Sequence, residues 1–125
     1  MALERIERAR YRVTNARGGS LTLGEGDDAD FTPVELLLTA IAGCTAIDVD
    51  YLTTKRAEPE RFAVEVSGDK LPEHVMANLE LLFDVAFGDD EAGRAAAARV
   101  AGAIATSHDR LCTVSRTEER GTPVR

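Results

Sequence analysis

The stretch Thr32-Pro-Val-Glu-Leu-Leu-Leu-Thr-Ala-Ile-Ala-Gly-Cys-Thr-Ala-Ile-Asp48 decides how this chain folds. It opens with helix-start signals, because Thr32 can cap the helix, Pro33 suits its first position and Glu35 follows in the first turn. We expect the helix to reach about Lys55-Arg56, since basic side chains favour a C-terminal end. The segment is apolar nearly all round, which is typical of a buried helix. Because one short chain buries a whole helix with difficulty, the sequence predicts a homodimer.

Alternating polar and apolar residues predict strands on both sides of this helix. The expected elements, in chain order, are a strand over 4–14, a turn over 15–19, a strand over 20–24, an acidic loop over 25–30, the helix from 33, strands over 61–67 and 75–87 with a turn over 68–73 between them, and an alanine-rich helix from about 90 to 107. Hairpins mixed with helices indicate an α+β fold with antiparallel sheet, in a single domain spanning residues 1–125.

Composition bounds the class of protein. An apolar content of 44% with 30% charged residues is ordinary for a soluble globular chain, and the absence of Trp predicts an aliphatic core. The net charge of −7 argues against nucleic acid and anionic membrane as partners, because both need clustered Lys and Arg. We expect no apolar run of membrane-spanning length and no signal peptide, and therefore a cytoplasmic protein. In that compartment a static disulfide is disfavoured, so paired cysteines indicate redox chemistry or inert burial.

The chain has two cysteines, Cys44 in the apolar helix and Cys112 in a tail after the second helix. They could form a disulfide, a dithiol or two unrelated thiols. A reactive Cys44 needs a nearby cation, because it lies in the middle of its helix, where the helix dipole contributes little. Asp48, one turn on, would oppose a thiolate unless it faces solvent or binds that cation. His74 and His108 lack metal-ligand spacing with the cysteines, so we expect neither a metal nor another cofactor.

The segment Thr32–Asp48, together with Leu111-Cys-Thr-Val-Ser-Arg-Thr117 and Gly121-Thr-Pro-Val124, resembles the OsmC/Ohr family of osmotically inducible and organic hydroperoxide resistance proteins. With the strand order, the resemblance covers nearly the whole chain. It implies an intertwined homodimer in which antiparallel sheets wrap around long central helices. It also implies a thiol-dependent peroxidase that acts on organic hydroperoxides and possibly on hydrogen peroxide.

By the same resemblance, Cys44 is the peroxidatic cysteine, Cys112 resolves it by forming a Cys44–Cys112 disulfide, and a dithiol, possibly of the lipoyl type, restores both. The resemblance also implies an activating Arg from the N-terminal region, for which Arg17 is the best match and Arg12 the second choice. Well-characterised members carry a Glu ten residues before the first Cys, where this chain has Val34. Its acid is Glu35, about half a turn out of phase with Cys44.

Two other functions stay open at this stage. The chain could be a non-catalytic protein of the same fold that binds a small apolar molecule in the dimer cleft, which the absence of an acid at Val34 favours. It could also be a structural dimer whose cysteines are too far apart to meet.

Overall fold

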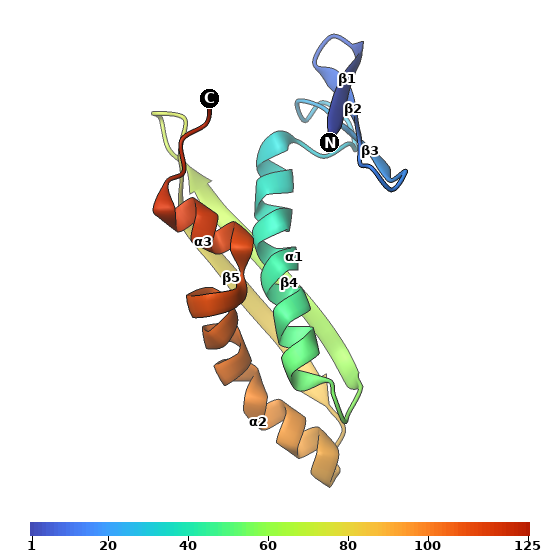
Figure 1. Cartoon of the computed structure of the whole chain (residues 1–125), viewed down its shortest axis with the longest axis vertical. Coiled ribbons are helices and arrows are strands. Elements are labelled where there is room, and N and C mark those ends of the chain that lie inside the picture. Colours follow the sequence, from blue (N-terminus) through green and yellow to red (C-terminus); the bar gives the residue numbers. More distant parts are fainter. The chain divides into compact units, whose positions relative to one another are not determined.

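A computed structural model describes all residues, 1–125, which fold as two compact units, residues 1–37 and 38–125. The elements, labelled in Figure 1 except for η1, are β1 (Ala2–Glu7), β2 (Arg10–Thr14), β3 (Ser20–Leu23), α1 (Pro33–Thr53), β4 (Pro59–Lys70), β5 (Met76–Phe87), α2 (Glu91–Thr106), the π-helical turn η1 (Ser107–Leu111) and α3 (Thr113–Arg120). One antiparallel sheet has the order β1-β2-β3 and the other pairs β4 with β5. The predicted α+β class with antiparallel sheet is confirmed.

The first unit contains one strand more than the sequence predicted. Residues 4–14 form two paired strands, because the chain reverses at Ala9, whose φ of 58° lies in the left-handed region. No Gly, Pro or Asn marks that reversal, and a left-handed Ala is uncommon. The hairpin of β2 and β3 is confirmed, and Asn15 shapes its turn by accepting the N–H groups of Arg17 (3.0 Å) and Gly19 (2.9 Å).

Ion pairs and an exposed apolar surface characterise this unit. Arg10 binds Asp30 and lies 3.6 Å from a carboxylate oxygen of Asp28, so the acidic loop is held against β2. Gly24 is the only buried residue in the unit, and Leu3 and Phe31 are at least half exposed. Three strands without a buried apolar face are marginally stable in water.

Helix α1 begins as the sequence predicted. The Thr32 hydroxyl accepts the N–H of Glu35, and the Glu35 carboxylate accepts the N–H of Thr32, each at 3.2 Å. This reciprocal pair is a capping box. The helix ends at Thr53, two residues earlier than expected, so Lys55 and Arg56 lie beyond its last turn.

The packing of α1 is one-sided within the single chain. Its buried residues form one stripe at helical spacing: Ile41, Ala42, Thr45, Val49 and Thr53. Ile47 and Tyr51 are 58% and 74% exposed, so the expected burial of the whole helix does not occur within one chain. By length and composition alone α1 could also cross a membrane, which corrects the expectation that no apolar run is long enough. The core helix of a soluble protein meets the same test, so this is weak evidence of a membrane location.

Strands β4 and β5 form one long hairpin in the second unit (Figure 1). Residues 68–70, expected to turn, belong to β4, and the turn is closed by Leu71 N–H donating to the Val75 carbonyl at 2.8 Å. Gly68 lies at a register shift, where an added Cβ would stand 2.6 Å from a Leu79 methyl group. Glycine in this strand therefore marks a bulge.

The C-terminal region contains helix α3, which the sequence analysis had described as a tail. Helix α2 begins at the Asp90 cap and passes at its end into the π-helical turn η1. Cys112 then caps α3, which ends at Gly121 in the left-handed conformation. The helix is short and polar, and a cysteine is not among the favoured capping residues. For these reasons the pattern gave no signal for α3.

The core is small and aliphatic, as predicted. Ile41 and Val49 of α1, Ala96 and Ala103 of α2, and Cys112 are its main members. Thr53 and Ser107 are also fully buried. The sheet adds an edge-to-face pair between Phe62 and Phe83, whose ring centroids are 6.3 Å apart.

Replacing either of two glycines of α2 by alanine should have opposite effects on the stability of the fold. At Gly93 an added Cβ would lie 2.0 Å from the Gly88 carbonyl oxygen, so we expect Gly93→Ala to destabilise the fold by about 1–3 kcal/mol through overpacking. At Gly102 an added Cβ would have no atom within 4 Å apart from its chain neighbours and the nearby backbone of its own helix. Gly102→Ala should therefore stabilise the fold by about 0.5–1 kcal/mol, because helix propensity dominates there. Urea unfolding of both variants measures the difference, and equal effects would contradict it.

Candidate functional site

The structure brings the Cys44 and Cys112 thiols close enough for each to shift the pKa of the other. Cys44 is half-buried in the middle of α1, whereas Cys112 is fully buried at the start of α3. Both are free thiols. The two cysteines are therefore neighbours in space, and the idea that they are too far apart to meet does not hold.

The first turn of α3 supplies hydrogen-bond donors to both sulfurs. Cys112 Sγ accepts the N–H of Ser115 at 3.4 Å and lies 3.2 Å from the Ser115 hydroxyl. The N–H groups of Val114 and Thr113 interact with Cys44. The first N–H groups of a helix have no partner within the helix and carry partial positive charge, which favours a thiolate nearby.

The two thiols differ in acidity. Burial raises the pKa of Cys44, and the hydrogen bond with Cys112 adds to that rise. Burial acts in the same direction at Cys112, but its contacts with Cys44, with the Ser115 hydroxyl and N–H, and with Thr45 together outweigh burial and lower the pKa of Cys112.

Asp48 has neither of the two placements expected from the sequence, which were exposure to solvent and binding of the cation that activates Cys44. Its carboxylate is half-buried and accepts a hydrogen bond from the Ser107 hydroxyl at 2.8 Å. It neither faces open solvent nor forms an ion pair with an arginine. The bond instead ties the middle of α1 to the start of η1, close to where Cys112 begins α3.

The other charged candidates lie in the N-terminal unit. Arg17 is exposed in the β2–β3 turn and forms no ion pair, and its role stays a prediction, as does that of Arg12. Glu35 belongs to the capping box of α1, which gives it a structural role.

A mainly apolar pocket of about 380 Å³ lies near the thiol pair, although neither cysteine is part of its lining. Its lining comes from α1, β5, α2, η1 and α3 and consists of Thr45, Leu79, Leu81, Leu82, Phe83, Ile104, His108 and Ser115. Two of these residues, Thr45 and Ser115, are also hydrogen-bond partners of Cys112. A molecule with a hydrocarbon portion therefore has a place to bind beside the sulfurs.

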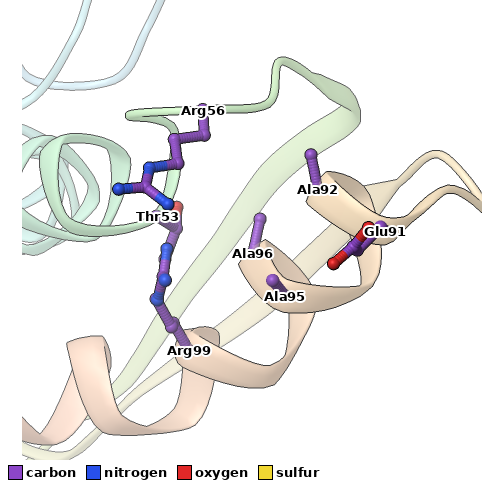
Figure 2. Close-up of a pocket in the computed structure, with 7 residues that line it drawn as sticks. All are labelled: Thr53, Arg56, Glu91, Ala92, Ala95, Ala96 and Arg99. Atoms are coloured by element: carbon purple, nitrogen blue, oxygen red, sulfur yellow. The ribbon is translucent and has the colours of Figure 1, made fainter.

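A second pocket, of about 300 Å³, lies between the end of α1 and the start of α2. Figure 2 shows Arg56 and Arg99 extending toward Thr53, with alanine side chains of α2 along one wall. This pocket contains no thiol, and the Thr53 hydroxyl already donates to the Val49 carbonyl at 2.7 Å. Its residues include no nucleophile comparable to the cysteine pair. Nowhere in residues 1–125 do three or more His, Cys, Asp or Glu side chains gather as possible metal ligands.

Sequence reasoning did not identify Thr45, Ser107 or Ser115 as parts of the site. A signal existed for Ser115, because Cys112-x-x-Ser115 has the spacing of a cap residue and the third residue of a helix. Thr45 follows Cys44 directly and gave no such signal. Its contact with Cys112 depends on how α3 packs against α1.

His108 connects η1 to α3. Its ring nitrogens lie 3.0 Å from Asp109 and 2.8 Å from Glu119, and these carboxylates raise the pKa of His108, Asp109 contributing first. Because the folded pKa exceeds the unfolded value of about 6.5, the stabilisation is complete below that pH and is lost as pH rises through the folded pKa. The imidazole is largely exposed, so the effect is small.

A pH series should reveal this link. Between about pH 6 and pH 9 the melting temperature of the wild-type protein should fall further than that of His108→Gln, by a few degrees at most. Thermal unfolding followed by circular dichroism checks it. Parallel curves for the two proteins would show that His108 does not help to hold α3.

Comparisons with known proteins agree with this architecture. The family model of OsmC-like proteins matches residues 24–125. A structural-genomics structure is 25% identical with a TM-score of 0.80, covering 99% of this chain and 92% of its own. A hypothetical protein from Aquifex aeolicus VF5 is 22% identical with a TM-score of 0.74, covering 99% of this chain and 89% of its own.

A crystal structure of an OsmC-like protein from Mycoplasma pneumoniae is 14% identical with a TM-score of 0.73, covering 94% of this chain and 84% of its own. At such identity this likeness shows the fold alone. No curated protein sequence matches. The family model nevertheless spans more than three quarters of the chain, on both of its compact units. The chain therefore belongs to the OsmC-like protein family.

Proposed function

We propose that this chain is a thiol-dependent peroxidase that reduces organic hydroperoxides through Cys44 and Cys112. The observation that carries the proposal is the proximity of the two thiols, near a mainly apolar pocket lined in part by Thr45 and Ser115, which neighbour Cys112. Membership of a family that includes peroxidases supports it. Cys44 is the cysteine that reaches the peroxide, because it is only half-buried whereas Cys112 is fully buried.

The reaction has three balanced steps. The Cys44 sulfur attacks the terminal oxygen of the hydroperoxide, a sulfur–oxygen bond forms, the oxygen–oxygen bond breaks, and the alkoxide takes up a proton to leave as an alcohol. The Cys112 sulfur then attacks the sulfenic sulfur, forming the disulfide and releasing hydroxide, which leaves as water once protonated. A dithiol reductant finally reduces the disulfide by exchange and is itself oxidised.

The apolar cavity gives a reason for the substrate preference. Leu81, Phe83 and Ile104 offer hydrocarbon surface to an organic tail, which hydrogen peroxide lacks. We therefore expect cumene hydroperoxide to react faster than hydrogen peroxide. Equal second-order rate constants for the two oxidants would remove the preference from the proposal.

The functional unit in this proposal is a cytoplasmic homodimer. Ile47 and Tyr51 project from α1 into solvent in the single chain, and the N-terminal unit buries no apolar side chain. A second copy would cover both surfaces. Sedimentation equilibrium measures this directly, and a monomer at micromolar concentration would contradict it. Cytoplasmic reductants would also keep the thiol pair available for reaction.

A non-catalytic role is the second candidate, and the apolar lining of the cavity favours it. In that case the cavity would hold a small apolar molecule and the thiols would be inert core residues. The two candidates predict different chemistry for Cys44, so one experiment separates them.

The test is to add one equivalent of cumene hydroperoxide to the reduced protein and to measure free thiols by mass spectrometry over time. The peroxidase predicts rapid loss of both thiols and a peptide linked through Cys44 and Cys112. Two unreacted thiols, with the hydroperoxide still present, would exclude the peroxidase and leave the binding role.

A further inference from the structure

Ser107 connects the backbone segments that carry the two cysteines. Its hydroxyl donates to the Asp48 carboxylate at 2.8 Å, and its carbonyl oxygen accepts the N–H of Cys112, also at 2.8 Å. Asp48 lies four residues after Cys44 on α1, so the two side chains share one face of that helix. One residue therefore binds the helix of the first thiol through its side chain and the backbone of the second thiol through its carbonyl.

The place of Ser107 in the fold leaves it little freedom to move. The residue is fully buried, and its N–H donates to the Ala103 and Ile104 carbonyls at the end of α2. It also begins η1, where the bond from the Cys112 N–H closes the π-helical turn. Such turns are rare in proteins and occur frequently at functional sites. A residue fixed on three sides is well suited to hold its neighbours in place.

The Asp48–Ser107 bond satisfies two polar groups that are costly to leave unpaired. A buried hydroxyl without a partner destabilises a fold, and a half-buried carboxylate also needs a donor. A hydrogen bond to a charged group is stronger than one between neutral groups, and it depends on distance and direction. The bond therefore fixes the spacing of α1 and η1 more closely than apolar packing alone would.

We propose that the Asp48–Ser107 hydrogen bond holds the sulfurs of Cys44 and Cys112 in position to join, and that it thereby sets how readily their disulfide forms. Asp48 and Ser107 are positioning residues, because they act through the placement of the two cysteines. This inference rests on the proposed function, in which that disulfide is the product of the second step.

Positioning of this kind has a measurable consequence. Two thiols held close together behave as if each were present at a high local concentration. In a glutathione buffer the two protein thiols pass two electrons and two protons to glutathione disulfide, which becomes two molecules of glutathione. The equilibrium constant of this exchange reports the local concentration. A looser hold on Cys112 lowers that constant and makes the protein disulfide easier to reduce.

The test is this equilibrium near neutral pH, with the disulfide fraction measured by mass spectrometry after alkylation of the free thiols. We expect Ser107→Ala to lower the equilibrium constant for disulfide formation by about tenfold, which makes the redox potential about 30 mV less negative. Asp48→Ala should have the same effect. Asp48→Asn keeps an oxygen that can accept the Ser107 hydroxyl, so it should stay close to the wild-type value.

Thr54→Ala is the matched control. It also removes a hydroxyl that donates to a carboxylate, that of Asp50 at 3.1 Å, but this bond lies at the end of α1 and does not reach η1. We expect Thr54→Ala to keep the wild-type equilibrium constant. An unchanged constant in Ser107→Ala would overturn the inference, and so would an equal fall in Thr54→Ala.

Urea unfolding of the reduced and oxidised forms separates positioning from a purely structural role. A purely structural bond would stabilise both forms equally, so its loss would leave the equilibrium constant unchanged. Comparison of Asp48→Ala with Asp48→Asn repeats the experiment without altering the buried serine. Since glutathione disulfide replaces the hydroperoxide as oxidant, the result is independent of whether the protein is a peroxidase.

Discussion

Replacing Cys44 by serine is expected to reduce hydroperoxide consumption to the uncatalysed background. A serine hydroxyl stays protonated at neutral pH and does not attack a peroxide oxygen, so no sulfenic acid forms and the cycle cannot begin. We expect a loss of at least about a thousandfold, as is usual when the nucleophile of an enzyme is removed. The measurement is the consumption of cumene hydroperoxide with a lipoyl-type dithiol as reductant.

Ala40→Ser is the matched control for this variant. It adds a hydroxyl to the exposed side of α1 one turn before Cys44 and leaves both thiols in place. We expect this variant to keep wild-type turnover. Peroxide reduction by Cys44→Ser at a wild-type rate would mean that Cys112 or another group is the nucleophile, and the assignment of Cys44 would be wrong.

The parts of the fold that could be predicted from the sequence depend on local signals. The start of α1 followed from Thr32, Pro33 and Glu35, and the capping box confirms it. The β2–β3 hairpin followed from alternation and from the turn at Asn15. In each case neighbours along the chain decide the structure, so the sequence alone is enough.

The elements that were missed depend on contacts that a pattern does not encode. Ala9 takes a left-handed conformation that alanine rarely adopts, so the division of β1 from β2 was not visible. Helix α3 is eight residues long and begins at a cysteine. Isolated helices of that length are unstable in water, and tertiary packing has to stabilise them.

The same distinction applies to the site. The two cysteines could be singled out from the sequence, because their motifs are short and local. The donors from Ser115 and Thr45 could not, because they depend on α3 packing against α1. The cavity is lined by residues of five elements, so it could not be predicted from the sequence either.

Helix α3 changes what the absence of an acid at Val34 implies for the activation of Cys44. The position of Cys44 in the middle of α1 predicts the need for a nearby cation, held by an acid that this chain lacks at position 34. The structure places the N-terminal end of a helix beside both sulfurs, and such an end favours a thiolate without any arginine. Glu35, the nearest acid in the sequence, caps α1. A weaker dependence on Arg17 follows from this arrangement.

Replacing Cys112 by serine should have the second largest effect, because it removes the resolving thiol. Serine is a better helix cap than cysteine, so we expect α3 to remain folded and the loss to be chemical. Sustained turnover should fall sharply, because no Cys44–Cys112 disulfide forms for the dithiol reductant to reduce by exchange.

The products of Cys112→Ser test the resolving task of Cys112. Without a resolving thiol, the sulfenic acid of Cys44 should persist and advance to sulfinic acid with excess hydroperoxide, whereas the wild-type protein forms the disulfide. Mass spectrometry after trapping of the sulfenic acid identifies each product, and stopped-flow measurement gives the rate of the first step. Wild-type turnover of Cys112→Ser, with no persistent sulfenic acid, would show that Cys112 is not the resolving thiol.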